Sequence, residues 1–294
     1  MEKRKLGKTG MDISIISFGG MIVDGMDAAD AAKAVSEAYD RGINYYDIAP
    51  TYGNSQYVLG PALEAYRKNV YLSCKTKART ATEAQAALEK SLRALKTDYF
   101  DIYQLHGLDD AEGIKTTFAS GGVMEALIRA KEKGYIRNIG VTCHRDAAVL
   151  EILRNYSDFA TLMFPINYGL YIKKGIGVIT LKACAENDIG FIAIKPLARR
   201  DLFQGEVRAL PGCWYYPIHD NPELARLALN FTLSQEVSTA IPPGDIKMLQ
   251  IALTIIEKQG GKSIPLTNSE NIELKGEVNN MKHFLLESWY DSYG

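Results

Sequence analysis

Three observations predict an α/β fold, a (β/α)8 TIM barrel with an N-terminal β-hairpin and a C-terminal extension. Eight β-rich runs alternate with helical segments from about residue 13 to residue 256. The runs begin about 30 residues apart, the length of one strand–helix unit. Eight such units account for most of the 294 residues, which would otherwise suffice for two domains. We expect one domain over residues 1–294, with the barrel at about 13–256 and the extension at 257–294.

The eight predicted strands are runs rich in Val, Ile, Tyr and Phe, residue types that favour strands. They start near Ser14, Asn44, Val70, Tyr99, Ile136, Thr161, Phe191 and Val237. Between them apolar residues recur at intervals of three or four, as at Ala84, Leu88 and Leu92. This spacing is the helical period and predicts helices between the strands.

A doubly wound open sheet also alternates strands with helices, but its first strand would normally lead into a glycine-rich phosphate turn. No GxGxxG occurs in this chain. Gly261-Lys262-Ser263 resembles the end of a P-loop, yet the first glycine of that motif would fall at Ile256. The barrel is therefore the favoured architecture.

The connections outside the regular pattern are informative. Gly7-Lys8-Thr9-Gly10 lies between two short extended runs and predicts a hairpin that closes one end of the barrel. Long connections at 107–122 and 197–221 follow the fourth and seventh strands. Connections of this kind lie at the carboxyl ends of the strands, where barrel enzymes carry their active sites.

The composition excludes several classes of function. With 34 Lys and Arg against 35 Asp and Glu, the net charge of −1 gives no general attraction to nucleic acid or to an anionic membrane. No stretch of 18 apolar residues occurs, and no apolar signal region follows the first residues. Four cysteines without a CxxC pair predict reduced thiols. We expect a soluble cytoplasmic protein without nucleic-acid or membrane partners; the sequence leaves its oligomeric state open.

Polar residues at strand ends converge on one face of a barrel. Lys75 ends an apolar run and must be paired if it is buried, and Asp47 at the end of the preceding strand is the expected partner. Tyr52 follows Asp47 in the next loop, where an ammonium would favour its phenolate and lower the pKa of its hydroxyl. His106 ends the fourth strand and could orient a substrate carbonyl. These four residues predict a proton-transfer site.

A metal-dependent hydrolase is an alternative from a different class. It would use His106, Cys143 and His144 together with Asp47. His144 is better explained as a loop or helix-cap residue, and the scattered candidates do not define a ligand shell. We therefore expect no metal site.

Four segments resemble the aldo-keto reductase family in order and spacing. They are 47–55 (Asp-Ile-Ala-Pro-Thr-Tyr-Gly-Asn-Ser), 72–76 (Leu-Ser-Cys-Lys-Thr), 90–106, which ends in Gln-Leu-His, and 134–142, which ends in Gly-Val-Thr. The resemblance implies a (β/α)8 barrel and NAD(P)H-dependent reduction of an aldehyde or ketone to an alcohol. It implies a hydride from the nicotinamide and a proton from Tyr52, with Lys75 and Asp47 tuning that tyrosine and His106 orienting the carbonyl. The alternative function is that of a non-catalytic nicotinamide-binding regulator with the same fold.

The same resemblance implies where the cofactor binds. Thr142, Cys143 and Asn167 would hold the carboxamide, although a thiol is a weak hydrogen-bond partner. The complete set of expected cofactor residues is Gly20, Met21, Asp47, Thr142, Cys143, Asn167, Lys195, Leu197, Ala198, Arg199, Arg200, Pro242, Gly244, Lys247 and Gln250. Residues 195–200 would lie along the pyrophosphate and 242–250 near the adenosine. NADP is the expected cofactor and NAD the alternative.

A small-molecule carbonyl compound is the expected substrate. Tyr52 and His106 would contact its carbonyl, and Trp214 and Tyr215 in the 197–221 connection would wall an apolar pocket. Trp289 and Tyr290 near the C-terminus are further candidates for that wall.

Overall fold

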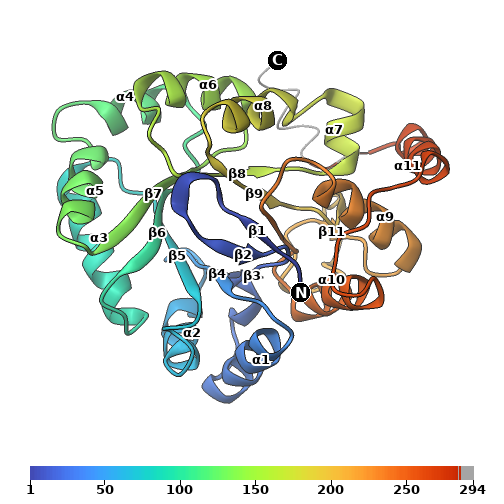
Figure 1. The fold of residues 1–294 in the computed structure, drawn as a ribbon, viewed down its shortest axis with the longest axis horizontal. Helices are drawn as coiled ribbons and strands as arrows, with labels where there is room; N and C mark the ends of the chain where they lie inside the picture. The colour runs from blue at the N-terminus through green and yellow to red at the C-terminus, as the bar shows by residue number, and fades with distance from the viewer. Residues whose placement is uncertain (284, 286–294) are drawn as a thin grey trace.

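The computed structural model describes residues 1–283 and 285. In this part of the chain eight parallel strands form a barrel surrounded by helices (Figure 1). Each strand pairs with the next along the barrel, from β3 to β9 in order and then with β12. Ile16 bridges Ala240 and so brings the first side of the sheet against the last. The (β/α)8 prediction is confirmed.

The barrel strands are short, and most lie entirely in the core. They are β3 (Phe18–Gly19), β4 (Tyr45–Asp47), β5 (Tyr71–Thr76), β6 (Phe100–Leu105), β7 (Ile136–Thr142), β8 (Thr161–Pro165), β9 (Gly190–Ile194) and β12 (Thr239–Ile241). Outside the barrel, β1 (Lys3–Lys5) pairs with β2 (Asp12–Ser14), and β10 (Ala198–Arg200) pairs with β11 (Tyr216–Pro217).

The helices present apolar faces to the barrel. They are α1 (Ala28–Asp40), α2 (Ser55–Leu63), α3 (Ala81–Ala94), α4 (Ala111–Phe118), α5 (Val123–Glu132), α6 (Asp146–Asn155), α7 (Tyr168–Lys174), α8 (Val178–Glu186), α9 (Pro222–Leu233), α10 (Ile246–Lys258) and α11 (Asn268–Asn280). Several begin where a side-chain oxygen accepts a hydrogen bond from a free backbone N–H of the first turn. The capping residues include Asp27, Thr80, Asp110, Asn221 and Asp245.

Seven of the eight predicted strand starts lie within two residues of the observed ones. The first prediction was wrong, because the strand that begins near Ser14 belongs to the hairpin and the barrel strand β3 begins only at Phe18. The backbone of residues 12–14 pairs with β1, and the Ser14 N–H also donates to Asn44 Oδ1 at 2.7 Å. The chain therefore joins the barrel only after the end of β2, the second strand of the hairpin.

The predicted N-terminal hairpin closes the amino-terminal end of the barrel. Figure 1 shows it in dark blue across the barrel opening. Leu6 and Ile13 are fully buried and pack with strand residues such as Tyr45. Gly7 has φ +47°, and a Cβ there would lie 2.2 Å from the backbone nitrogen of Gly190, so only glycine permits this close approach.

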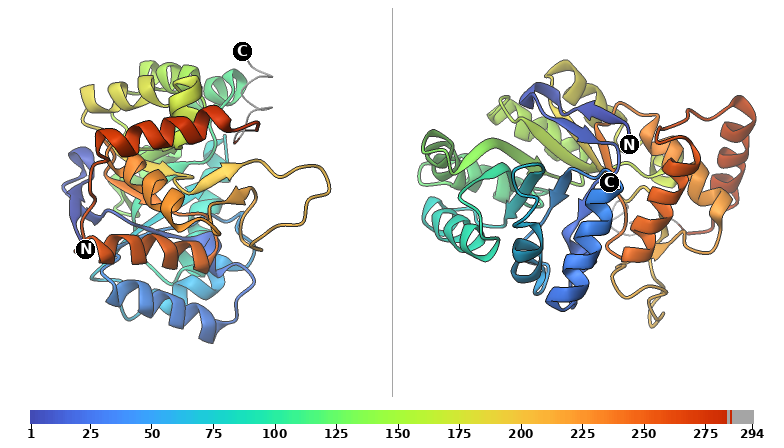
Figure 2. Two further views of the ribbon diagram at one scale, coloured as in Figure 1. Left: turned by 90° about the vertical axis from the view of Figure 1, so that its right-hand side faces the viewer. Right: turned by 60° about the horizontal axis from the view of Figure 1, so that its bottom comes forward.

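Both long connections contain ordered structure. The 107–122 segment holds α4, an additional helix, where the sequence predicts a loop. The 197–221 segment holds the β10–β11 pair, from which a loop projects well away from the barrel (Figure 2). These segments place additional residues at the carboxyl ends of the strands.

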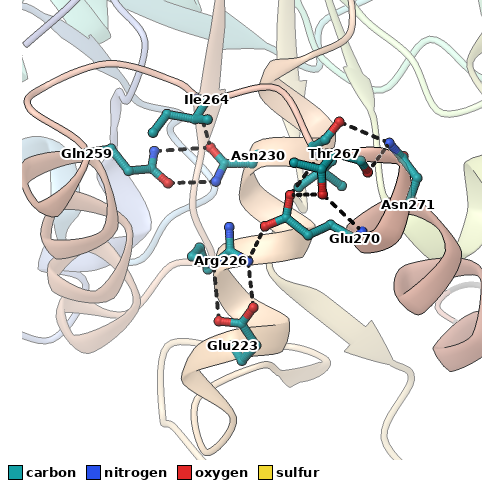
Figure 3. Close-up of polar contacts among 9 residues, drawn as sticks. Glu223, Arg226, Asn230, Gln259, Ile264, Thr267, Glu270 and Asn271 are labelled. Carbon is teal, nitrogen blue, oxygen red and sulfur yellow. Dashed lines mark hydrogen bonds and ion pairs between the residues drawn. The ribbon is translucent and has the colours of Figure 1, made fainter.

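A polar network joins the start of the C-terminal extension to the barrel (Figure 3). Arg226 on α9 bonds Glu223 and also Glu270, the third residue of α11, each at 2.5 Å. The buried Asn230 exchanges hydrogen bonds with Gln259 at 2.7 and 3.2 Å. Helix α11 in turn contacts α7 and α9. The described part of the extension is therefore docked on the barrel.

Replacing Asn230 by alanine is expected to lower the free energy of unfolding by about 1–3 kcal/mol, because the amide of Gln259 loses its partner. Chemical denaturation of the purified protein measures the change. Glu89→Gln is the control, since the contacts of Glu89 with Arg93 and Gln85 are exposed and the substitution should change stability by less than about 1 kcal/mol. Equal stability of Asn230→Ala and the wild type would show that the network does not hold the extension.

Candidate active site

A cleft of about 200 Å³ lies at the carboxyl ends of the barrel strands. Its apolar floor includes Met163 and Ile241, which also pack in the cluster that contains the hairpin residues. The predicted site residues that line it are Met21, Asp47, Tyr52, Lys75, His106, Thr142, Lys195, Trp214, Tyr215, Pro242 and Gly244. Residues from seven barrel strands and several connections thus meet in one place.

Lys75 and Asp47 form a buried ion pair, as the sequence predicts. Asp47 ends β4 beside Ser73 of β5, and Lys75 lies two residues further along β5 on the same face. Lys75 Nζ donates to Asp47 Oδ2, while Gln104 Nε2 donates to Asp47 Oδ1 at 3.0 Å. Burial favours a neutral lysine, but Asp47 and Tyr52 outweigh it and raise the pKa of Lys75 well above its ordinary value. Lys75 therefore carries a positive charge at neutral pH.

Tyr52 reaches this pair from the β4–α2 connection. Lys75 Nζ donates to Tyr52 Oη at 3.3 Å and lies 5.1 Å from the centre of its ring. The next residue, Gly53, has φ +47°, and a Cβ there would lie 1.9 Å from Asp24 Oδ1, so glycine permits this turn.

The expected lowering of the Tyr52 pKa was wrong. Burial of the phenol raises its pKa above the ordinary value, and the attraction of Lys75 offsets only part of that effect. Asp47 adds a negative charge nearby, which also raises the pKa of Tyr52. The phenol therefore stays protonated at neutral pH, which is the state that a proton donor needs.

His106 follows β6 and faces Tyr52. The two ring centres are 6.2 Å apart and the rings are nearly perpendicular. Burial, with the positive charge of Lys75, lowers the pKa of His106 to about 3. Its imidazole is therefore neutral at physiological pH and can donate one hydrogen bond without carrying a charge.

His144 and Asp109 form a pair beside the catalytic candidates that was not expected from the sequence. The backbone N–H of His144 donates to Asp109 Oδ1 at 2.6 Å, and His144 Nδ1 lies 3.2 Å from Asp109 Oδ2. His144 lines the cleft. The available signal was its position, two residues after Thr142 at the end of β7.

Lys195 follows β9 and contributes a cation to the cleft. Its backbone has φ +64°, a strained value for a residue other than glycine, and Asn167 Nδ2 donates to its carbonyl at 3.2 Å. No hydrogen bond or ion pair of its ammonium is found among residues 1–283 and 285. Burial lowers the pKa of Lys195 to about 8.

Several expected cofactor residues lie behind the cleft rather than in its lining. The Asn167 amide bonds the carbonyls of Lys195 and Ala198, and its Oδ1 accepts from Gly169 N, so the side chain holds backbone in place. The Cys143 thiol is buried and bonds Arg145 O at 3.4 Å. Leu197 and Ala198 are buried in the core, and Gly20 lies beside the cleft residues Gly19 and Met21.

Arg199 and Arg200 point away from the cleft. Arg199 bonds Glu277 of α11 at 3.0 Å, and Arg200 bonds Glu206 in the projecting loop at 2.7 and 2.8 Å. Nearby carboxylates thus hold both side chains, and neither lines the cleft; their expected place along a cofactor phosphate stays a prediction.

Lys247 and Gln250 line a second hollow, a surface groove of about 920 Å³ between α9 and α10. This groove and the cleft share no lining residue. Between them, the turn that contains Gly244 packs against Gly212 of the projecting loop, where a Cβ on Gly212 would lie 1.9 Å from Gly244 O. The expected adenosine residues are thus divided: Pro242 and Gly244 line the cleft, and Lys247 and Gln250 line the groove.

Residues 1–283 and 285 contain no group of three or more His, Cys, Asp or Glu side chains that could hold a metal ion. Among them, no helix has the length and apolar character needed to cross a bilayer. Trp289 and Tyr290 lie outside the described residues.

The fold and the cleft define a class of protein, (β/α)8 barrels in which a tyrosine, a lysine and an aspartate are in contact in a cleft at the carboxyl ends of the strands. The profile of the aldo/keto reductase family matches residues 15–288. The chain therefore belongs to the aldo-keto reductase family, a family of NAD(P)-dependent oxidoreductases.

Individual relatives agree with this assignment. An uncharacterized oxidoreductase of Bacillus subtilis is 30% identical over 68% of this chain and 66% of its own length. An aldo-keto reductase of the same organism is 34% identical over 48% of this chain and 47% of its own length. The matched part of the chain thus spans between half and two thirds of these relatives. The solved holo form of an aldo-keto reductase from Bacillus halodurans has the same fold, with a TM-score of 0.72 and 24% identity over 95% of this chain and 96% of that chain.

Proposed function

We propose that the protein is an NAD(P)H-dependent reductase that converts an aldehyde or ketone to an alcohol. The observation that carries the proposal is the contact of Lys75 Nζ with both Asp47 and Tyr52 Oη in a cleft at the carboxyl ends of the strands. The non-catalytic alternative is not favoured, because all four members of the expected catalytic set line one cleft.

Each of these residues has a separate task. Tyr52 donates its proton to the carbonyl oxygen of the substrate, and the adjacent Lys75 ammonium stabilises the phenolate that remains. Asp47 holds Lys75 in position and keeps it charged. Neutral His106 donates a hydrogen bond to the same carbonyl and orients it. In the oxidation direction Tyr52 takes the proton back.

The residues present fit a nicotinamide cofactor. Lys195 is a cation aimed into the cleft and suits a phosphate oxygen, while Met21, Thr142, Pro242 and Gly244 line the space beside it. The groove with Lys247 and Gln250 suits the adenosine end. When bound, the reduced nicotinamide supplies the hydride for the carbonyl carbon. NADP is the proposed form, because the exposed Lys247 in this groove offers a cation that suits a 2′-phosphate.

The substrate proposed is a small carbonyl compound with an apolar part. Trp214 and Tyr215 line the cleft from the loop after β9 and offer aromatic surface above the catalytic groups. Because α11 docks on α7 and α9, we also propose that the barrel and the extension act as one domain.

Titration with NADPH and NADH, combined with turnover of a panel of aldehydes and ketones, tests this function. We expect NADPH to bind more tightly than NADH and at least one carbonyl compound to be reduced. Absence of binding by both cofactors would overturn the proposal. A preference for NADH would overturn only the choice of NADP.

The role of Lys195 predicts a pH dependence. Only its protonated form attracts a phosphate, so cofactor affinity should fall as pH rises through about 8. Lys195→Met should weaken binding about tenfold at pH 7 and remove this pH step. Lys195→Arg is the matched control. Arginine keeps its charge above pH 8, so this variant should bind the cofactor equally well below and above pH 8. Identical pH profiles for the wild type and Lys195→Met, measured by fluorescence titration, would exclude this role.

A further inference from the structure

At the base of the projecting loop at 201–215, Arg200 makes several contacts with the loop. Its guanidinium donates to both carboxylate oxygens of Glu206, at 2.7 and 2.8 Å, and to Asp201 O at 2.9 Å. The guanidinium carbon also lies 4.2 Å from the ring centre of Phe203 and 4.3 Å from that of Tyr216. Arg200 thus contacts two aromatic rings and is bonded to the loop.

Glu206 completes the contact from the loop side. Besides Arg200, it accepts a hydrogen bond from the backbone N–H of Phe203 at 2.8 Å. The bonds to Arg200 and Phe203 lower the pKa of Glu206 to about 2, so its charge persists at all physiological pH values. We call Arg200, Glu206, Phe203 and Tyr216 the Arg200 clasp.

Apolar side chains near the clasp are exposed, whereas Leu210 and Cys213 further along the loop are buried. Val207 at its tip is 87% exposed and Phe203 is 49% exposed. The β10–β11 ladder that closes the loop is only two pairs long and is irregular between Ala198 and Arg200. Backbone pairing alone is therefore weak. Residues 212–216 are positioned by the buried Cys213, by the packing of Gly212 on Gly244 and, at Tyr216, by the clasp.

The position of residues 214–216 matters because two of them form one wall of the cleft. Trp214 and Tyr215 line the cleft, and Tyr216 is the next residue. Tyr216 pairs with Arg200 across the β10–β11 ladder and stacks on its guanidinium. Any shift of Tyr216 therefore moves Tyr215 relative to Tyr52.

We propose that the Arg200 clasp is a specificity-determining device that holds the Trp214–Tyr215 wall in place for bulky apolar carbonyl substrates. The clasp is a positioning element and touches neither the substrate nor the reacting atoms. The inference rests on the proposed reductase function, which supplies the substrate for the wall. It is an alternative to a direct contact of Arg200 with a cofactor phosphate.

A phosphate-binding role and a clasp role of Arg200 predict different effects of replacing Glu206. If Arg200 bound a phosphate, Glu206→Gln would free the cation and leave cofactor binding equal or tighter, whereas Arg200→Met would weaken it. If Arg200 is a clasp, both variants lose the same contact. Both should then raise KM for a bulky substrate, and the double variant should behave like either single one.

Steady-state kinetics of Arg200→Met, Glu206→Gln and the double variant test the clasp with a two-ring aromatic aldehyde and with propanal. We expect KM for the aromatic aldehyde to rise about 5- to 30-fold in all three, because two aromatic side chains lose their fixed positions. KM for propanal should change far less, and the dissociation constant of NADPH should stay within about twofold. Arg93→Met and Glu89→Gln, in an exposed pair on α3, are the matched controls.

Tryptophan fluorescence gives a readout that does not need turnover. The chain has two tryptophans, Trp214 and Trp289. In a Trp289→Phe background, Trp214 alone reports the wall, and its quenching by acrylamide should increase when the clasp is broken. Failure of the proposed function would appear as absent turnover, whereas failure of the clasp would appear as unchanged quenching. Unchanged quenching and KM, or weaker NADPH binding in Arg200→Met but not in Glu206→Gln, would overturn the inference.

Discussion

Tyr52→Phe is expected to lower kcat for carbonyl reduction by about 10²- to 10⁴-fold, the range typical for loss of a positioned proton donor. The substitution removes only the hydroxyl that Lys75 contacts at 3.3 Å and keeps the ring that packs near His106. Cofactor affinity should therefore stay within about twofold. Steady-state kinetics and NADPH titration of the purified variant measure both quantities.

Tyr57→Phe is the matched control, because Tyr57 lies five residues further along the chain with a side chain that is 58% exposed. Its kcat should equal that of the wild type. If Tyr52→Phe retained more than about a tenth of the wild-type kcat, another group would have to supply the proton. Loss of cofactor binding in Tyr52→Phe would instead show that the phenol holds the cofactor.

Lys75→Met is expected to lower the free energy of unfolding by about 3–5 kcal/mol and to reduce turnover as well. The substitution leaves Asp47 buried at 3% exposure without its positive partner, and an uncompensated buried charge is costly. In the variant, burial should raise the pKa of Asp47 in the folded state above that in the unfolded state. The folded protein then binds the extra proton, so stability rises as pH falls and the loss is smaller at pH 5 than at pH 8.

The double variant Asp47→Asn/Lys75→Met separates charge from packing. It removes both charges, so most of the stability lost in Lys75→Met should return, while turnover stays low. Urea denaturation at the two pH values measures all three proteins. If the double variant were as unstable as Lys75→Met at pH 8, the lost stability would come from the shape of the methionine and not from the unpaired carboxylate.

Much of the fold could be predicted from the sequence, because it depends on local periodicity. Alternation of β-rich runs with helical segments is repeated eight times, so an error at one element does not change the architecture. The displaced start of the first barrel strand shows the limit. Residues 12–14 have strand character in either position, and only their pairing with Lys3–Lys5 decides between hairpin and barrel.

Site residues that lie at the ends of barrel strands could be predicted from the sequence. Asp47 and Lys75 lie on neighbouring strands, so their pairing follows from barrel geometry. Loop residues were not predictable in this way. His144 and Asp109 meet across 35 residues of sequence, and Arg200 turns to Glu206 because that carboxylate is near, which no periodicity indicates.

The sequence by itself determined the barrel, the buried Lys75–Asp47 pair and the place of Tyr52 beside it, since each follows from residue type and position along a strand. The tertiary structure alone decided the protonation of Tyr52 and His106, because burial depends on every element that surrounds the cleft. It also decided which cations face the cleft. Lys195 points into it while Arg199 and Arg200 are held by Glu277 and Glu206, because side-chain ion pairs form between groups that only folding brings together.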